Sequence, residues 1–300
     1  MEVAMEAELE KILENSPWNK TEIENWRNIL NAGQFGEFIL KADAEAIATY
    51  NQTCSEEYRI QTNLLPQPFI GTPEAPIWIL NQNPGYCEID HYDMLGEKTE
   101  IQEWMNKNNI TLRPETEDEY SLKKRQKMIL DQLTFETPID FYILDDDFDT
   151  IEYEGQKLFG GYNWWNKKLL QENLCNGDKK MLSNFFVLEF FPYHSEKFGQ
   201  KLSNTEVVHS KVWKELVSYA LKSKKLLICR GEKIIKEIQT FPDFAGNSKR
   251  VLRFSSPQNV TVSKNNLISL EDYARSKRTD DAKKKHAAKL VYAALNKKSE

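Results

Sequence analysis

The chain has 300 residues, enough for one large domain or two small ones, and a content of 40% hydrophobic residues with 15 Phe, 12 Tyr and 7 Trp excludes wholesale disorder. Its net charge of −6 gives no overall attraction to nucleic acid or to an anionic membrane, so a basic binding surface must be local. No apolar run approaches the roughly 20 residues that span a bilayer, and the acidic N-terminus does not resemble a signal peptide. We therefore expect a cytoplasmic protein without a membrane partner.

The four cysteines do not form a metal-binding pattern. They are scattered along the chain without a Cys-x-x-Cys pair, which gives no support for a zinc or iron–sulfur site. The acidic run 145–149 lacks the glycine and the terminal glutamate of an EF-hand, so we interpret it as a solvated or autoinhibitory loop. We therefore expect reduced, mostly buried thiols and no metal or other cofactor.

Helical and extended patterns alternate along the chain. The first 50 residues place apolar side chains at helical spacing and predict three helices. From residue 76 onward, short apolar runs bounded by turn residues predict buried strands, and amphipathic stretches between them predict helices. The predicted strands cover 76–80, 184–191, 224–229 and 251–254, and the predicted helices cover 160–174, 204–223, 232–238 and 269–300, the last as one helix or two.

This alternation predicts an α/β fold with three α/β/α layers, a central and mostly parallel sheet, and helical extensions at both ends. We expect residues 1–62 to form a helical N-terminal elaboration, 63–270 an α/β domain, and 271–300 a basic C-terminal helix. The lysines and arginines of the last segment predict either a clamp for a duplex backbone or an ordinary solvated helix face.

Three of the predicted strands run into unusual polar segments. These segments are Asn-Gln-Asn-Pro-Gly-Tyr at 81–86, Glu-Phe-Phe-Pro-Tyr-His at 189–194, and Ser-Ser-Pro-Gln-Asn at 255–259. In parallel α/β sheets, ligands bind beyond the carboxyl ends of the strands. We therefore expect the three segments to face one cleft.

In this order and at these separations, the three segments resemble the motifs of the uracil-DNA glycosylase superfamily, closest to its single-strand-selective and thymine-type branches. The first motif, Gly-x-Asn-Pro-Gly, is matched at 81–85 with Asn81 in place of the first Gly. The second is an aromatic strand with Asn and then Pro three residues later, and Glu189 stands in the Asn position. The third, His-Pro-Ser-Pro, is matched at 254–257 with Phe254 in the His position. The likeness covers about residues 70–270.

The resemblance implies a DNA glycosylase that takes a base out of the stack and hydrolyses its N-glycosidic bond. It also implies a role in DNA repair, no metal, and a nucleic-acid partner, with DNA favoured over RNA. The positions that it marks are Asn83 and Ser256 for catalysis; Gln82, Gly85, Tyr86, Glu189 and Phe254 for contact with the base; and Pro84, Ser255, Pro257 and Asn259 for contact with the nucleic acid.

Asn83 is our candidate for positioning a water near C1′ of the sugar. Its amide both accepts and donates hydrogen bonds, but it is a weaker base than a carboxylate. The alternative is that Asn83 bonds within its own turn. Gly85 would allow close approach of a base or sugar and Tyr86 would wall the pocket, and the alternative for both is a tight turn with a packed aromatic ring.

Glu189 replaces the Asn of the second motif, and this difference bears on which base the protein recognises. An ionised Glu only accepts hydrogen bonds, which suits the amino group of cytosine. We therefore expect an amino-bearing pyrimidine, such as a modified cytosine, rather than uracil. A Glu protonated because of burial among Phe185, Phe190 and Phe191 would weaken that inference, and a Glu paired with a Lys or Arg is the structural alternative.

Phe254 bears on whether the protein catalyses at all. Phenylalanine has no donor for the departing base, and loss of one such donor typically costs about 10²–10³ in rate. His194 is one candidate substitute, and its alternative is a capping or surface histidine. Without a substitute, the same cleft predicts an inactive module that binds nucleic acid or a nucleotide, or an interaction protein that reuses the fold.

Overall fold

The structure is a computed structural model of the chain. It describes residues 2–18, 20–32, 36–85, 129–133, 152–153, 156–157, 179–199, 202, 204–255, 262–263, 265–276 and 280–296. The predicted helix at 160–174 and the acidic run at 145–149 lie outside these residues.

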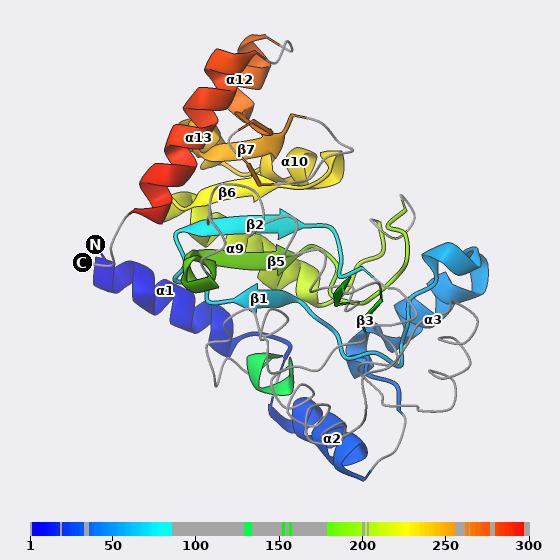
Figure 1. The fold of residues 1–300 in the computed structure, drawn as a ribbon. Coiled ribbons are helices and arrows are strands. Elements are labelled where there is room, and N and C mark those ends of the chain that lie inside the picture. The colour runs from blue at the N-terminus through cyan, green and yellow to red at the C-terminus, as the bar shows by residue number, and fades with distance from the viewer. Residues whose placement is uncertain are drawn as a thin grey trace.

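The fold is mixed α/β around a six-stranded sheet (Figure 1). The strand order is β1-β5-β2-β6-β7-β8, in which the four central strands are parallel and the two edge strands are antiparallel to their neighbours. The strands are β1 (Phe69–Gly71), β2 (Ile77–Asn81), β5 (Phe185–Glu189), β6 (Leu226–Cys229), β7 (Val251–Phe254) and β8 (Leu267–Ser269), with a separate hairpin of β3 (Glu152–Tyr153) and β4 (Gln156–Lys157). The predicted α/β class and the four central strands are confirmed.

Helices precede the sheet, connect its strands and close the chain. They are α1 (Glu2–Glu14), α2 (Lys20–Asn31), α3 (Ala44–Thr53), α9 (His209–Lys222), α10 (Glu232–Ile238), α11 (Phe244–Asn247), α12 (Leu270–Arg275) and α13 (Asp281–Leu295), and the 3₁₀ helices are η1 (Lys41–Asp43), η2 (Glu56–Tyr58), η5 (Lys179–Asn184) and η6 (Ser248–Arg250). Side-chain caps fix the starts of the last two α-helices, since Ser269 accepts from the Asp272 N–H and Asp280 from the Lys283 N–H. The C-terminal segment is therefore two helices.

Burial of the strands on both faces explains their apolar sequences. Every residue of β2 and β5 is buried. Trp78 packs against Phe186 of the neighbouring strand and against Tyr219 of α9, with ring centroids 4.6 and 6.2 Å apart. Because side chains alternate along a strand, Asn81 and Glu189 point to the face of the sheet opposite α9.

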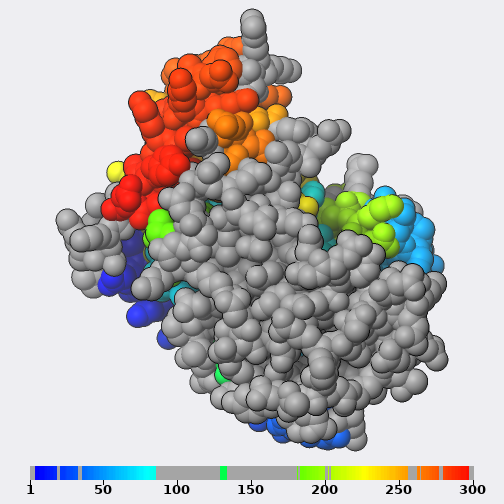
Figure 2. Space-filling view, in the orientation of Figure 1, coloured from blue at the N-terminus to red at the C-terminus, as the bar shows by residue number. Residues whose placement is uncertain are grey.

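The N-terminal helices join the same core as the sheet. Trp18, Trp26 and Phe38 are buried in one hydrophobic cluster with the residues of the central strands. The division of the chain at residues 62 and 270 stays a prediction. In the face shown by Figure 2, α12 and α13 (orange and red) lie at the upper left and α3 (light blue) lies at the right. Within the described ranges, no helix is long and apolar enough to cross a membrane.

Candidate functional site

The carboxyl ends of the four parallel strands meet at one edge of the sheet. After β2 the chain forms β5, which lies next to β2 on one side. It then crosses back over β2 to form β6, which lies next to β2 on the other side, and continues outward to β7. The order therefore reverses beside β2, and in open α/β sheets such a reversal opens the crevice in which ligands bind. Among the described residues, Asn81 and Glu189 end β2 and β5 at this edge, and Arg230 and Ser255 directly follow β6 and β7 there.

Three polar side chains form a connected cluster at this edge. Asn81 lies opposite Glu189 in the pairing of β2 with β5, and its Nδ2 donates to Glu189 Oε1 at 2.8 Å. Its Oδ1 accepts from Nη1 of Arg230, the first residue after β6, at 2.9 Å. Arginine only donates hydrogen bonds, so the contact with Arg230 determines which end of the Asn81 amide faces Glu189.

One oxygen of Glu189 has no hydrogen-bond partner within the described part of the chain. Its side chain is 2% exposed, and no described residue donates to or accepts from Oε2. Burial raises the pKa of Glu189 to about 8, while the Asn81 hydrogen bond and the charge of Arg230 oppose the rise. At neutral pH the group is therefore mainly a carboxylic acid, and because Oε1 already accepts from Asn81, Oε2 is the position for its proton.

The carbonyl oxygen of Glu189 is held by a second chain of contacts. His209 Nε2 lies 3.0 Å from this oxygen, and His209 Nδ1 accepts from Trp18 Nε1 at 3.4 Å. Burial lowers the pKa of His209 to about 4, so the ring is neutral and can donate at one nitrogen while accepting at the other. The N-terminal segment thus supports the end of β5.

The Asn83 side chain is anchored on both sides of its loop. Nδ2 lies 2.9 Å from the carbonyl oxygen of Pro84, which is the bond within its own turn, and 2.8 Å from Ser195 Oγ. The turn bond to Pro84 was the expected alternative, the contact with Ser195 was not expected, and both involve Nδ2. None of the hydrogen bonds among the described residues engages Oδ1. The amide oxygen is therefore the group that can accept from a water molecule.

His194 is buried, so its interpretation as a surface histidine is wrong. Nδ1 lies 2.8 Å from the carbonyl oxygen of Gly85 and Nε2 lies 3.1 Å from that of Leu65. Burial lowers the pKa of His194, whereas the two carbonyl groups raise it. The ring ties the loop after β2 to the segment that precedes β1, and it is not placed as a donor for a ligand.

Gln82 is closely packed against Gly231, whereas Gly85 has free space beside it among the described residues. Gly231 has φ of +94°, and a Cβ at this position would lie 2.7 Å from Gln82 Nε2, so the glycine allows Gln82 to pack over the end of β6. A Cβ at Gly85 would meet no described atom within 4 Å, which leaves open space beside that backbone. Pro84 is buried.

The third segment contributes no free donor among its described residues. Phe254 is 6% exposed, and the Ser255 hydroxyl donates to Asn266 Oδ1 at 2.9 Å. Tyr86, Ser256, Pro257 and Asn259 lie outside the described residues, so their predicted roles stay predictions.

Sequence reasoning placed Asn81 in the first polar segment without giving it a role, and it missed Arg230 and Ser195. The sequence does mark two of these positions, because a polar residue directly follows an apolar run: Asn81 follows Ile-Trp-Ile-Leu and Arg230 follows Leu-Leu-Ile-Cys. Ser195 is not marked in this way, since its role depends on the chain returning from β5 toward the loop at 83–85. Within the described residues, no group of three or more His, Cys, Asp or Glu side chains could hold a metal ion.

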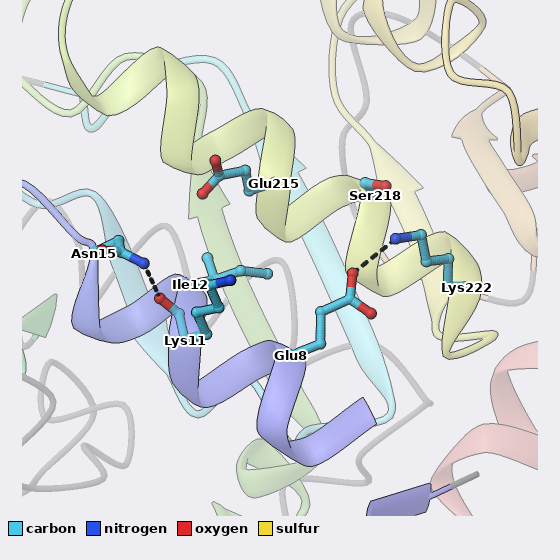
Figure 3. A pocket seen from close by; sticks show the side chains of 7 residues that line it. All are labelled: Glu8, Lys11, Ile12, Asn15, Glu215, Ser218 and Lys222. Carbon is cyan, nitrogen blue, oxygen red and sulfur yellow. Dashed lines mark hydrogen bonds and ion pairs between the residues drawn. The ribbon is translucent and has the colours of Figure 1, made fainter. Parts of the chain in front are cut away.

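A separate hollow of about 280 Å³ lies between α1 and α9 (Figure 3). It is crossed by an ion pair between Lys222 Nζ and Glu8 Oε1 at 2.7 Å. The residues that line it are Glu8, Lys11, Ile12, Asn15, Glu215, Ser218 and Lys222, and no predicted site residue is among them.

Comparison of the chain with protein-family models, with curated proteins and with solved structures found no match.

Proposed function

We propose that the protein is a DNA glycosylase-like hydrolase, which encloses a flipped-out pyrimidine base at the carboxyl edge of β5, β2 and β6 and cleaves its N-glycosidic bond. The observation that carries the proposal is the buried Glu189 carboxyl, whose Oε2 has no partner among the described residues although Asn81 and Arg230 order the rest of the cluster. A buried polar atom without a partner calls for an explanation such as a ligand. The proposal includes the three-layer arrangement, a cytoplasmic location and a role in DNA repair.

Glu189 would read the edge of the base. A carboxylic acid offers a donor and an acceptor, whereas a carboxylate offers acceptors alone. An amino-bearing base fits when its N–H₂ group donates to an ionised Oε2, so its binding must displace the proton that burial holds on Glu189 at neutral pH, a loss that the charge of Arg230 eases. Binding of such a base would strengthen as the pH rises toward 8, while binding of a base with an oxygen at that position would weaken.

Asn83 would place the attacking water. Hydrolysis breaks the bond from C1′ to the base nitrogen, the electron pair leaves with the base, and the water oxygen bonds to C1′ while a proton of the water ends on the base. The amide oxygen of Asn83 accepts a hydrogen bond from this water and orients it without removing the proton in the ground state. Arg230, a permanent cation at the same edge, would stabilise the departing base in place of the donor that Phe254 lacks.

Base release from a panel of oligonucleotides tests this proposal. The panel carries uracil, thymine, cytosine and modified cytosines, in single and double strands of DNA and in RNA, and alkaline cleavage of the strand reports the abasic site. We expect release of at least one amino-bearing base, and roughly 10²-fold slower release by Asn83→Ala. Intact strands across the whole panel after long incubation would reject the hydrolase.

The second candidate is a module that binds a base without cleaving it. It is favoured by the third segment, where Phe254 is buried and the Ser255 hydroxyl is already engaged with Asn266. In this case, the same oligonucleotides bind in a filter assay at two salt concentrations, and Glu189→Gln changes which base is preferred, but no abasic site forms.

A further inference from the structure

Ser195 adjoins the amide of Asn83 and, together with the Pro84 carbonyl oxygen, accepts from its Nδ2. Asn83 Nδ2 lies 2.8 Å from Ser195 Oγ and 3.4 Å from the Ser195 carbonyl oxygen. The Ser195 hydroxyl in turn donates to the carbonyl oxygen of Lys197 at 3.1 Å. Because a hydroxyl has one proton, Ser195 Oγ accepts from Asn83 and does not donate to it.

The same contacts exclude the opposite orientation of the amide. Rotation by 180° would place Asn83 Oδ1 against the carbonyl oxygens of Pro84 and Ser195 and against a hydroxyl whose proton is already engaged. Oxygen would then face three acceptors and Nδ2 would lose all of its acceptors, which is costly in a side chain that is 7% exposed.

We propose that Ser195 is a positioning residue for the proposed hydrolysis: it fixes the Asn83 amide so that the oxygen, and not the NH₂ group, is offered to the attacking water. The inference rests on the proposed function. The neighbouring His194 holds the backbone of the same loop at Gly85, so residues 194 and 195 together fix both the loop and the direction of its amide.

Kinetics of three variants test this role. We expect Ser195→Ala to lower kcat roughly tenfold and to leave KM within about twofold, because a misoriented water affects the transition state and not substrate binding. Ser195→Thr keeps a hydroxyl and should restore most of kcat. Ser218→Ala, on α9 in the hollow beside α1, is the control for the loss of a serine hydroxyl. A kcat for Ser195→Ala equal to that of the wild type overturns the proposal.

Hydrogen exchange of the Asn83 side-chain NH₂ group, followed by ¹⁵N NMR and assigned with Asn83→Ala, separates this proposal from the hydrolysis itself. We expect slow exchange in the wild type and in Ser195→Thr, and exchange at least about fivefold faster in Ser195→Ala, since one acceptor is lost. If the wild type releases no base, the proposed function is wrong and the exchange data alone decide the orienting role. Equal exchange in all three proteins overturns it.

Discussion

Two buried carboxyl groups, Asp43 at the end of η1 and Glu189 at the end of β5, differ in how they are satisfied. Asp43 is 1% exposed and Glu189 is 2% exposed. Asp43 Oδ1 accepts from the backbone N–H of Val208 at 2.8 Å, and Oδ2 accepts from the Tyr193 hydroxyl at 2.7 Å. Glu189 has a partner at Oε1 and none among the described residues at Oε2.

The contrast separates a carboxyl group that holds the fold together from one that is available to a ligand. Burial raises the pKa of Asp43, but its two hydrogen bonds act against the rise, and it joins η1 to the start of α9. Burial raises the pKa of Glu189 to about 8 with only partial opposition. Buried ionisable groups that lower the stability of the folded protein and hold no other part of it in place are concentrated at functional sites.

The largest predicted effect is a gain of stability in Glu189→Gln. The folded-state pKa of Glu189 is about 8 against an ordinary value of 4.5, so at neutral pH the folded protein holds a proton that the unfolded chain has lost. The stability that Glu189 contributes is complete below about pH 4.5 and is lost as the pH rises to about 8. Gln keeps the acceptor for Asn81 and has no charge, so the variant should be more stable by on the order of 3 kcal/mol at pH 7.

Denaturant unfolding of the wild type and Glu189→Gln from pH 4.5 to 8 measures this effect. We expect the two free energies of unfolding to converge at the acid end and to separate as the pH rises. The exposed Glu10→Gln is the matched control for removal of a carboxylate. A constant difference at every pH would mean that Glu189 is ionised in the folded protein, and the comparison with Asp43 would then fail.

The matching substitution at the other carboxyl, Asp43→Asn, should have the opposite sign. Asn offers one acceptor oxygen where Asp43 serves both Val208 and Tyr193. One buried donor is left unsatisfied, which costs about 2 kcal/mol. The measurement is the free energy of unfolding at pH 7, beside Glu189→Gln. Stabilisation by both substitutions would remove the distinction between the two groups.

The central sheet was predictable from the sequence because its strands are buried on both faces. Runs such as Ile-Trp-Ile-Leu and Leu-Leu-Ile-Cys, bounded by turn residues, are sufficient to indicate strands. The edge strands β1 and β8 were missed, since each has three residues and is defined by its hydrogen bonds to a neighbouring strand. Pairing with a distant partner is not encoded in a run of that length.

The candidate site was predictable only where a residue's chemistry could be read locally. Asn83 and Glu189 stand out because polar residues follow buried strands. The Asn81–Arg230 contact depends on β2 lying between β5 and β6, which no local pattern determines. The protonation of Glu189 likewise depends on the degree of its burial, and sequence reasoning could state it only as an alternative to the ionised form.

A smaller loss of stability is expected when Asp43, like Glu189, is left with one carboxyl oxygen that has no hydrogen-bond donor among the described residues. Tyr193→Phe removes the hydroxyl that donates to Asp43 Oδ2 and accepts from the Leu40 N–H. We expect a loss of about 1.5 kcal/mol in the free energy of unfolding and a further rise in the pKa of Asp43, because the Tyr193 hydrogen bond lowers it. The second effect is measured by ¹³C NMR titration of the carboxyl. Tyr50→Phe, which removes a single bond to the Tyr58 carbonyl oxygen, is the control, and an unchanged Asp43 titration would contradict the assigned role of Tyr193.

The smallest effect is expected for a carboxyl group that is not buried. Glu8 on α1 pairs with Lys222 on α9 at 2.7 Å, but their side chains are 35% and 42% exposed. Water and salt screen such pairs, so Glu8→Gln should cost no more than about 0.5 kcal/mol, and the cost should fall further at high ionic strength. Unfolding at two salt concentrations measures it. In this pair, as in the buried contacts, a donor bonds to a carboxyl oxygen. A cost as large as that of Asp43→Asn would therefore show that burial is not what distinguishes the carboxyl groups of this protein.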